Sequence, residues 1–366
     1  MQAVLNQFAE QVRSAAAQRT PLRIRGGGSK DFYGQALTGA VLETRALRGM
    51  TNYEPSELVV SVLAGTPLAE LEQELAAHAQ HLPFEPPHFG PGATVGGMVA
   101  AGLSGPARAV KGAVRDYVLG VQMIGGQGQV LRFGGQVMKN VAGYDVSRLM
   151  AGSMGTLGLL TEVSLKVLPL AVAEATLRLE ATQAEALRLL NRWAGRPLPL
   201  DASCWRQQQH GHGLLWLRLR GAQAAVRAAR EQIGGEAIEQ PQALAFWQAL
   251  REQEADFFRG PAHACLWRLS VPDTAAVLPL AAEDALLEWG GALRWVWAPA
   301  AQAAALRAQA ANVGGSATLF RRAADDAALD VPVFHPLSPA LQQIHRALKD
   351  QFDPAGVFGT GRMPLG

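Results

Sequence analysis

The chain has 366 residues, 49% of them hydrophobic, and is therefore long enough to build two domains with separate hydrophobic cores. Its 33 Lys and Arg against 31 Asp and Glu give a formal net charge of +2, too small to indicate a nucleic-acid surface. The only cysteines, Cys204 and Cys265, form no C-x-x-C pair, which excludes an iron–sulfur cluster and disfavours a disulfide framework. No stretch reaches 18 apolar residues and the N-terminus lacks a signal-peptide core, so we expect a cytoplasmic protein.

The first region, up to about residue 170, is rich in glycine and alternates short strands with helices. Apolar runs predict strands in residues 57–66, 117–133 and 155–170, the second interrupted by a Gly-rich turn. Residues 67–80 predict an amphipathic helix with Pro67 in its first turn, and residues 98–105 a short apolar helix.

The second region, about residues 171–330, is rich in Ala, Arg and Gln and holds all eight tryptophans. Strands are predicted at residues 175–181, 213–220, 264–271 and 292–298, and helices at residues 183–195, 222–234 and 301–315. This alternation favours an α+β domain with a mostly antiparallel sheet covered on one face. The third region, residues 331–366, predicts a helix capped by Ser338 and a turn-rich tail, which we expect to return to the first domain.

Three glycine-rich stretches in the first region, residues 21–34, 90–105 and 140–169, suggest close approach of the backbone to a ligand. In the first stretch three consecutive glycines lie between Arg25 and Lys30, a composition suited to cradling a phosphate, although a Gly-rich β-turn is the alternative. Asp31 stands where G-x-G-x-x-G requires its third glycine, and no G-x-x-x-x-G-K-[ST] is present, so Rossmann and P-loop sites are excluded. Three such stretches favour a long ligand in an extended groove, as a dinucleotide would need.

In order and spacing, these stretches resemble the FAD-binding domain of the vanillyl-alcohol oxidase / p-cresol methylhydroxylase (PCMH) type. The resemblance extends over about residues 21–169 and resumes at residues 352–362. Within that superfamily, residues 21–34, 82–108, 112–120 and 134–158 are most similar to the FAD-binding E subunits of glycolate oxidase (glycolate dehydrogenase). The resemblance implies an α+β protein with a two-subdomain PCMH-type FAD-binding domain (residues 1–170), an α+β cap domain (171–330) and a returning C-terminal segment (331–366).

The resemblance also assigns cofactor-binding roles to residues in three motifs and the tail. These are Arg25, Gly26, Gly27, Gly28, Ser29 and Lys30, with Gly34, in the pyrophosphate loop; Thr94, Gly96, Gly97, Gly102 and Ser104 along the diphosphate and flavin; and Gly155, Gly158 and Leu160 at the adenine end. Arg115 and Asp145 are also candidates, with a structural ion pair or helix cap as the alternative, and Arg362 is a candidate whose alternative is surface exposure. A β-branched side chain at Gly27 is expected to abolish FAD binding, because it resists positive φ and blocks the amides.

The chain departs from many relatives in two ways. No histidine lies between Met1 and Ala77, so the resemblance implies FAD that is bound non-covalently. The metal-binding histidine motif of hydroxy-acid-oxidising relatives is not found, and we expect no metal. His210 and His212 would share one face of a strand, which is compatible with a metal pair, but a loop or solvent-facing pair is the favoured interpretation. His81, Glu85 and His88 are interpreted as part of a packing loop.

These observations predict an FAD-binding subunit of a multi-subunit glycolate oxidase that oxidises glycolate, a 2-hydroxy acid, and passes electrons to partner subunits. The implied partners are a sister flavoprotein subunit and an iron–sulfur subunit, through which any membrane contact would be made. A substrate carboxylate would need a cation. Arg206, Arg321 and Arg322 are candidates, but no catalytic base can be chosen from the sequence. The alternatives are a stand-alone FAD-dependent 2-hydroxy-acid dehydrogenase and a structural FAD-binding assembly module.

Overall fold

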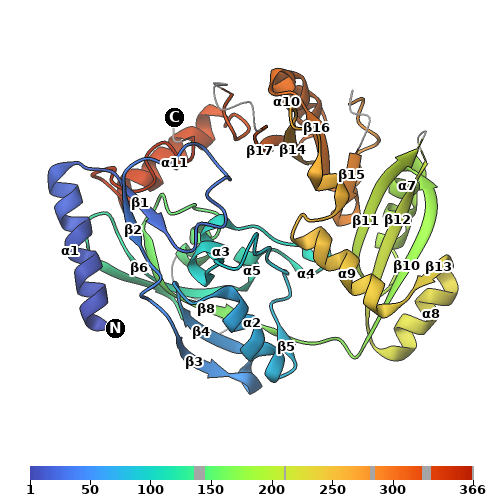
Figure 1. The fold of residues 1–366 in the computed structure, drawn as a ribbon, viewed down its shortest axis with the longest axis horizontal. Coiled ribbons are helices and arrows are strands. Elements are labelled where there is room, and N and C mark those ends of the chain that lie inside the picture. The colour runs from blue at the N-terminus through green and yellow to red at the C-terminus, as the bar shows by residue number, and fades with distance from the viewer. Residues whose placement is uncertain (136–144, 210–211, 281–284, 324–330, 365–366) are drawn as a thin grey trace. The chain divides into compact units, whose positions relative to one another are not determined.

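The computed structural model describes the chain except residues 136–144, 210–211, 281–284, 324–330 and 365–366 (Figure 1). The chain divides into two compact units. Unit 1 consists of residues 1–104, 113–170 and 336–366, and unit 2 of residues 105–112 and 171–335. Residues 105–112 lie within the first sequence region but pack with the second unit. In the parts of the chain that the structure describes, no helix combines the length and apolarity that crossing a membrane requires.

Unit 1 is built on a five-stranded antiparallel sheet with the order β3–β4–β8–β6–β7. Its strands are β3 (Met50–Glu54), β4 (Val59–Leu63), β6 (Val118–Ile124), β7 (Val130–Gly134) and β8 (Leu159–Lys166). Four helices contribute to the core on this sheet: α2 (Leu68–Ala77), α3 (Val95–Ala101), α5 (Val114–Tyr117) and α6 (Val146–Met150). The strands predicted in the first region and the helix predicted at residues 67–80 are therefore confirmed, whereas the short helix predicted at residues 98–105 begins three residues earlier and ends at Ala101. The short antiparallel pair β5 (Gln80–His81) and β9 (Leu168–Pro169) forms a separate two-stranded sheet.

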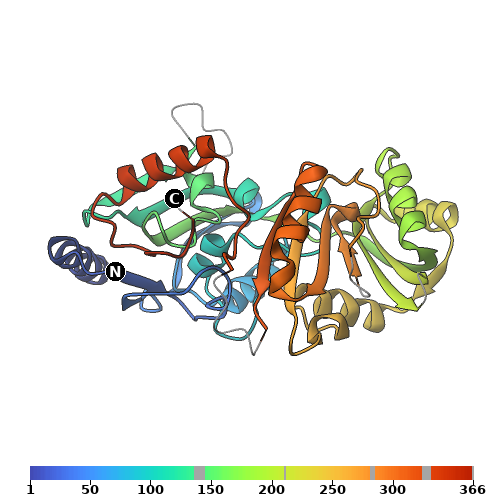
Figure 2. The same cartoon turned by 90° about the horizontal axis from the view of Figure 1, so that it is seen from above.

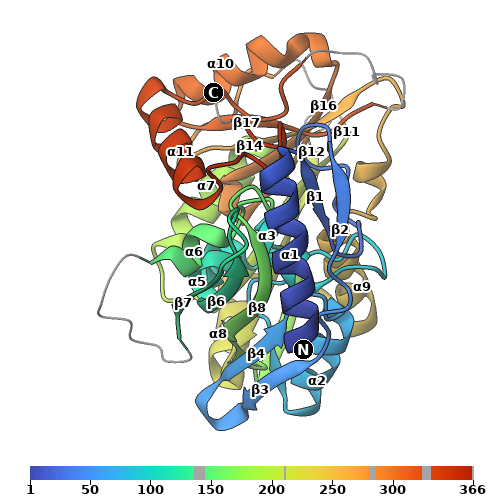
Figure 3. The ribbon, with the colours of Figure 1, turned by 90° about the vertical axis from the view of Figure 1, so that its left-hand side faces the viewer.

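A second core cluster of unit 1 joins both ends of the chain. Helix α1 (Gln2–Gln18) packs beside the parallel pair β1 (Leu22–Arg25) and β2 (Ala40–Glu43), as Figure 3 shows. The tail residues Val357 and Phe358 are buried in the same cluster, and Phe358 forms a bridge to Leu22. The tail therefore completes the element from which the first glycine-rich loop leaves.

Helix α11 (Pro339–Phe352) begins at Ser338, whose side chain accepts a hydrogen bond from the amide of Leu341, as predicted. Helix α11 is drawn in red in Figure 2. Its last turn contacts the five-stranded sheet through Phe352, whose ring centroid lies 6.1 Å from that of Phe133 on β7. Lys349 then donates to the carbonyl oxygens of Thr156 and Phe358 at 2.8 and 2.7 Å. These contacts attach the C-terminal segment to unit 1.

Unit 2 contains an eight-stranded antiparallel sheet with the order β13–β10–β12–β11–β15–β16–β14–β17. The strands are β10 (Ala173–Thr182), β11 (Leu200–Gln209), β12 (His212–Gly221), β13 (Glu236–Ile238), β14 (Cys265–Ser270), β15 (Ala285–Glu288), β16 (Leu293–Ala298) and β17 (Ser316–Arg321). The four strands predicted in this region correspond to β10, β12, β14 and β16, and the antiparallel sheet is confirmed.

Helices contact both faces of this sheet, which differs from the expected one-sided cover. The predicted helices α7 (Gln183–Ala194), α8 (Gln223–Ile233) and α10 (Ala303–Asn312) pack on the core of one face. On β12, Leu217 belongs to that core, and its neighbours Trp216 and Arg218 point to the opposite face. There Phe246 and Trp247 of α9 (Gln240–Arg251) stack on these two side chains. The aromatic residues of α9 thus pack on the sheet face opposite the main core of unit 2.

Residues 105–112, which include α4 (Arg108–Lys111), are held to unit 2 by one tryptophan and one ion pair. The indole of Trp289 donates to the carbonyl of Gly105 at 2.9 Å, and the Arg108 guanidinium lies 4.5 Å from the Trp289 ring. The Lys111 ammonium is 3.7 Å from the buried carboxylate of Asp201. These contacts explain why a segment inserted in the first region belongs to the second unit.

Candidate functional site

The first glycine-rich loop follows β1 and requires glycine for three separate reasons. At Gly28 the backbone has φ of 73°, which favours glycine. A Cβ on Gly27 would lie 1.4 Å from the carbonyl oxygen of Gly92, and a Cβ on Gly26 would lie 2.3 Å from Oγ1 of Thr94. Gly27 itself does not have positive φ, so that part of the expected reason for its identity was wrong, whereas the expected blocking of the amides stays a prediction. Close approach to the second glycine-rich stretch is the cause.

The second stretch enters helix α3 through Thr94, whose hydroxyl accepts a hydrogen bond from the amide of Gly97 at 3.3 Å. Because Gly26 contacts Thr94 and Gly27 contacts Gly92, the two glycine-rich stretches form a single surface. The structure therefore brings together residues that are more than 60 positions apart in the sequence.

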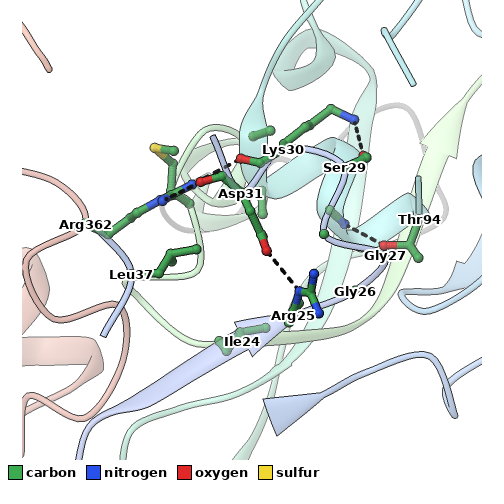
Figure 4. Close-up of a pocket in the computed structure, with 15 residues that line it drawn as sticks. Ile24, Arg25, Gly26, Gly27, Ser29, Lys30, Asp31, Leu37, Thr94 and Arg362 are labelled. Atoms are coloured by element: carbon green, nitrogen blue, oxygen red, sulfur yellow. Dashed lines mark hydrogen bonds and ion pairs between the residues drawn. The ribbon is translucent and has the colours of Figure 1, made fainter. Parts of the chain in front are cut away.

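These two stretches line a cavity of about 100 Å³ in unit 1 (Figure 4). Of the predicted residues it is lined by Arg25, Gly26, Gly27, Gly28, Ser29, Lys30, Thr94, Gly97 and Arg362, and it is completed by Ile24, Asp31, Leu37, Ala100, Ala101 and Met154. Within the described part of the chain, the backbone amides from Gly26 to Ser29 have no hydrogen-bond partner. Several amides that converge beside cations form an anion-binding concavity.

The size of the cavity limits what it can enclose. Cavities that bury a whole small-molecule ligand usually measure about 300–1,000 Å³. A cavity of about 100 Å³ accommodates a phosphate-sized portion of a ligand rather than a complete dinucleotide. The remaining portions of a long ligand would lie outside this cavity, whose lining takes only Met154 from the third glycine-rich stretch.

Three cations lie in the wall of the cavity, and each is held by hydrogen bonds. Arg25 donates through Nε to Oδ2 of Asp31 at 2.9 Å. Lys30 donates to the carbonyl of His88 at 3.1 Å, and its ammonium lies 5.5 Å from the Phe89 ring. Lys30 thus joins the first loop to residues just before the second glycine-rich stretch.

Arg362 is buried, with 5% of its surface exposed, so the alternative of surface exposure is wrong. Its guanidinium donates to the carbonyl oxygens of Lys30, Asp31 and Gln35 at 3.2, 3.2 and 2.8 Å. Burial lowers the pKa of Arg362 below its ordinary value. The tail arginine therefore fastens the loop that carries Lys30, which is a positioning role seen directly in the structure.

Several predicted residues lie near the cavity without lining it. Gly34 has φ of 99°, and a Cβ there would lie 2.8 Å from Met154 and 2.9 Å from Arg362. Gly155 has φ of 73° and lies beside Ile24, at 3.5 Å from an added Cβ. Gly34 and Gly155 therefore allow the chain to pack around cavity-lining side chains.

Four other predicted residues have packing explanations in the structure. A Cβ on Gly96 would lie 2.7 Å from Ala64, and one on Gly158 would lie 2.2 Å from Met123. Gly102 ends α3 with φ of 64°. Leu160 is buried in the core of the five-stranded sheet with 6% exposure. Any contact that these residues make with a cofactor stays a prediction.

The polar candidates outside the loop have local partners or solvent exposure. Ser104 accepts a hydrogen bond from the amide of Val114 at 3.2 Å and so closes the base of the segment 105–113. Asp145 caps α6 and pairs with Arg148 at 2.8 Å, which is the capping alternative considered from the sequence. Arg115 is exposed. The residues 136–144 of the third motif lie outside the described chain.

Sequence reasoning missed Asp31 and Arg23 as parts of the site. Asp31 was noticed only as the residue that breaks a Rossmann fingerprint, yet it lines the cavity and also accepts from Arg23 at 2.7 Å. The signal was available, because Arg23 and Arg25 are two positions apart on a strand and share a face. Leu37 and Met154 carry no comparable signal, since they meet the loop only through the fold.

In unit 2, two of the three candidate arginines donate hydrogen bonds within their own unit. Arg321 donates to Gln253 at 3.0 Å, and Arg322 donates to the carbonyl of Val331 at 3.0 Å. Burial lowers the pKa of Arg321. Arg206, the third candidate clamp, lies on β11.

Among the described residues, no three or more His, Cys, Asp or Glu side chains lie close enough together to bind a metal ion. His212 is exposed at the start of β12, and His210 lies outside the described residues, so the proposed pair is untested. His88 pairs with Glu72 at 2.9 Å, in agreement with a packing loop.

The chain is similar to known proteins in both sequence and fold. The FAD binding domain family matches residues 5–134. Glycolate oxidase subunit GlcE of Escherichia coli (strain K12) is 48% identical over 354 residues, which cover 97% of this chain and 95% of that protein. Glycolate oxidase subunit GlcD of Bacillus subtilis (strain 168) is 32% identical over 162 residues, 43% of this chain and 34% of that protein.

A solved structure of alkyldihydroxyacetonephosphate synthase superposes with a TM-score of 0.65 over 96% of this chain and 74% of that one, at 14% identity. At this identity the likeness shows the fold alone, and it agrees with the PCMH-type architecture expected from the sequence. The GlcE match is of a different kind, because almost half of all residues are identical over nearly the whole length of both chains. The chain therefore belongs to the family of glycolate oxidase subunit GlcE and carries an FAD-binding domain of the PCMH type.

Proposed function

We propose that this chain is the FAD-bearing E subunit of a multi-subunit glycolate oxidase, which oxidises glycolate to glyoxylate. The single observation that carries the proposal is the 48% identity to a GlcE subunit over 97% of the chain. The site agrees with it, since the glycine amides of the first loop line a cavity beside Arg25 and Lys30, and a Cβ at Gly27 would clash with the Gly92 backbone that packs against this loop. Such a cradle suits the diphosphate of FAD.

In this proposal the chain's own residues bind and orient the cofactor. The amides of Gly26 to Ser29 would donate to the diphosphate oxygens, and the cations Arg25 and Lys30 would offset their charge. Arg362 would keep the loop in place through its three carbonyl contacts. When bound, the flavin supplies the redox chemistry, since it accepts a hydride and can release electrons singly. The protein contributes binding, orientation and exclusion of water.

We place the oxidation of substrate in a complex with other subunits. A GlcD-type flavoprotein subunit is the proposed site of the hydroxy acid, and an iron–sulfur subunit is the proposed electron acceptor. Two observations on this chain support the division of labour. Cys204 and Cys265 are both buried, lie on the separate strands β11 and β14 and form no disulfide bond, so they do not make the cysteine grouping that an iron–sulfur cluster needs. The candidate carboxylate clamps Arg321 and Arg322 are engaged within unit 2.

The identity and attachment of the cofactor can be tested on the purified chain. We expect FAD rather than FMN, bound without a covalent link, because no histidine precedes His78 to attach it through the first loop. Acid precipitation followed by chromatography of the supernatant measures both properties. Yellow colour retained by the protein pellet, or FMN in the supernatant, would contradict this expectation.

The role as a subunit can be tested by anaerobic mixing with millimolar glycolate or D-lactate. We expect the isolated, FAD-loaded chain to keep its flavin absorbance, and bleaching to appear once the partner subunits are added. Rapid bleaching of the chain alone would favour the alternative of a stand-alone dehydrogenase. A redox titration addresses the remaining alternative, because a purely structural flavin would exchange no electrons in the potential range of the complex.

A further inference from the structure

One carboxylate in the cavity wall binds two arginines at the same time. Oδ2 of Asp31 accepts from Nη2 of Arg23 at 2.7 Å and from Nε of Arg25 at 2.9 Å, and Figure 4 shows the contact with Arg25. All three side chains are partly buried, with exposed fractions of 25% for Arg23, 41% for Arg25 and 32% for Asp31. The group is therefore only partly screened by solvent.

The two arginines need a counter-anion when no anionic ligand is present. They lie on β1 two positions apart, so their side chains leave the same face of the strand. A single oxygen atom is in hydrogen-bond contact with both, which places two guanidinium groups close together. Without a shared anion they would repel each other. Nε of Arg23 is buried and makes no hydrogen bond in the described part of the chain. The hydrogen bond from Nη2 of Arg23 to Asp31 is therefore not accompanied by a second one from Nε.

The position of this carboxylate opposes an anionic ligand. Asp31 lines the same cavity as the unpartnered amides and the cations Arg25 and Lys30. An anion in that cavity would gain from every one of those groups and would be repelled by Asp31. Asp31 also occupies the Nε edge of Arg25, which a phosphate could otherwise contact in a bidentate manner.

We propose that Asp31 is an internal counter-anion that stands in for the cofactor's diphosphate and limits the affinity of the site for FAD. It neutralises Arg23 and Arg25 in the cofactor-free protein, and it competes electrostatically with the diphosphate when FAD binds. The consequence is a cofactor that is held reversibly rather than at the highest affinity the cradle allows. This inference rests on the proposed FAD site and adds a residue that sets its strength.

The test compares Asp31→Asn with Asp31→Glu. The asparagine keeps the size and an acceptor oxygen but removes the charge, whereas the glutamate keeps the charge. Apo-protein is titrated with FAD at low salt, with quenching of flavin fluorescence as the readout. We expect Asp31→Asn to lower the Kd about tenfold, which corresponds to about 1.4 kcal/mol, and Asp31→Glu not to lower it. At about 1 M salt the gain should shrink, because the groups are partly exposed and screened.

Two further measurements separate the causes. The thermal midpoint of apo-Asp31→Asn should fall, because the arginines lose their anion, while that of the FAD-bound variant should not. FMN, which lacks the diphosphate bridge, should show a smaller gain than FAD. An unchanged or weaker affinity of Asp31→Asn for FAD would overturn the proposal, and a weaker one would show that Asp31 instead orients Arg25 for the cofactor.

If the cavity were not the FAD site, the variants would give a different pattern of FAD affinities. Arg25→Gln should weaken FAD binding if the cavity holds the diphosphate. If Arg25→Gln and both Asp31 variants bind FAD with the same affinity as the unmodified chain, the cavity is not the cofactor site, and both proposals fail. If only Arg25→Gln alters the affinity, the site stands and the role of Asp31 is refuted.

Discussion

The attachment of the C-terminal segment to unit 1 depends on Asp353, and its removal should be severely destabilising. The carboxylate is completely buried and accepts from the Lys349 ammonium at 2.5 Å. It also accepts from the amides of Val357 and Phe358 at 3.0 and 2.7 Å. Replacing it with alanine leaves a buried ammonium without its anion and two buried amides without an acceptor.

The magnitude follows from these contacts. Loss of one partner from a buried ion pair costs about 3–5 kcal/mol, and each hydrogen bond to a charged group contributes about 1.5–3 kcal/mol. Because Lys349 keeps two carbonyl acceptors, we expect a loss of about 3–5 kcal/mol rather than the sum. For a domain of this size that corresponds to about 6–20 °C in the midpoint of thermal unfolding.

The measurement is urea and thermal unfolding of Asp353→Ala, with release of FAD as the probe of unit 1. The matched control is Asp350→Ala, which removes an exposed carboxylate from the same helix and should change stability by less than about 0.5 kcal/mol. Should Asp353→Ala fail to fold, Asp353→Asn keeps one acceptor oxygen and should lose about half as much. A loss below about 1 kcal/mol for Asp353→Ala, or equal effects at both positions, would refute the assignment of the anchor.

Three other outcomes follow from the structure. Gly27→Ala should abolish FAD binding and lower stability, since its Cβ would lie 1.4 Å from a carbonyl oxygen, whereas Gly195→Ala, with 3.9 Å of room, should bind FAD normally in the same titration. Neutral His335 accepts a hydrogen bond from the amide of Ala317, and burial lowers the pKa of His335 in the folded protein. Its contribution to stability is therefore complete above the unfolded pKa of about 6.5 and is lost as the pH falls through the lower pKa of the folded state. Urea unfolding between pH 7 and 5 should show this decline, and His335→Asn should reduce it. Burial raises the pKa of the Cys204 thiol, so Cys204 should not react with a thiol reagent before unfolding. Cys265 should be equally unreactive because reagent cannot reach its buried side chain.

Much of the fold could be predicted because its elements carry regular hydrophobic patterns. The apolar run of β4 and the capped helix α11 correspond closely to their predicted positions. Strand β11 was not predicted, because it carries the polar residues Asp201 and Ser203 that are buried only through tertiary partners. Arg218 on the neighbouring strand donates to Asp201 at 2.7 Å, and no local pattern reveals that pairing.

The site was predictable in its backbone and less so in its charges. Three consecutive glycines between two cations predict an anion-binding loop whatever the surrounding fold, and Gly26 to Gly28 do line the cavity. The reason for Gly27 was not accessible from the sequence, since it depends on the distant Gly92. The same limit applies to Arg362, which follows the first loop by more than 300 residues and yet binds its carbonyls.

These contacts together indicate why the cofactor cradle and the C-terminal tail depend on each other. Phe358 forms a bridge to Leu22 on β1, and β1 carries the arginines that Asp31 neutralises. Four residues later Arg362 fastens the far end of the loop through the carbonyl of Lys30. The tail thus holds both sides of the cradle, while Asp353 holds the tail. Since a phosphate cradle binds well only when its amides are already oriented, loss of the Asp353 anchor should weaken FAD binding as well as folding.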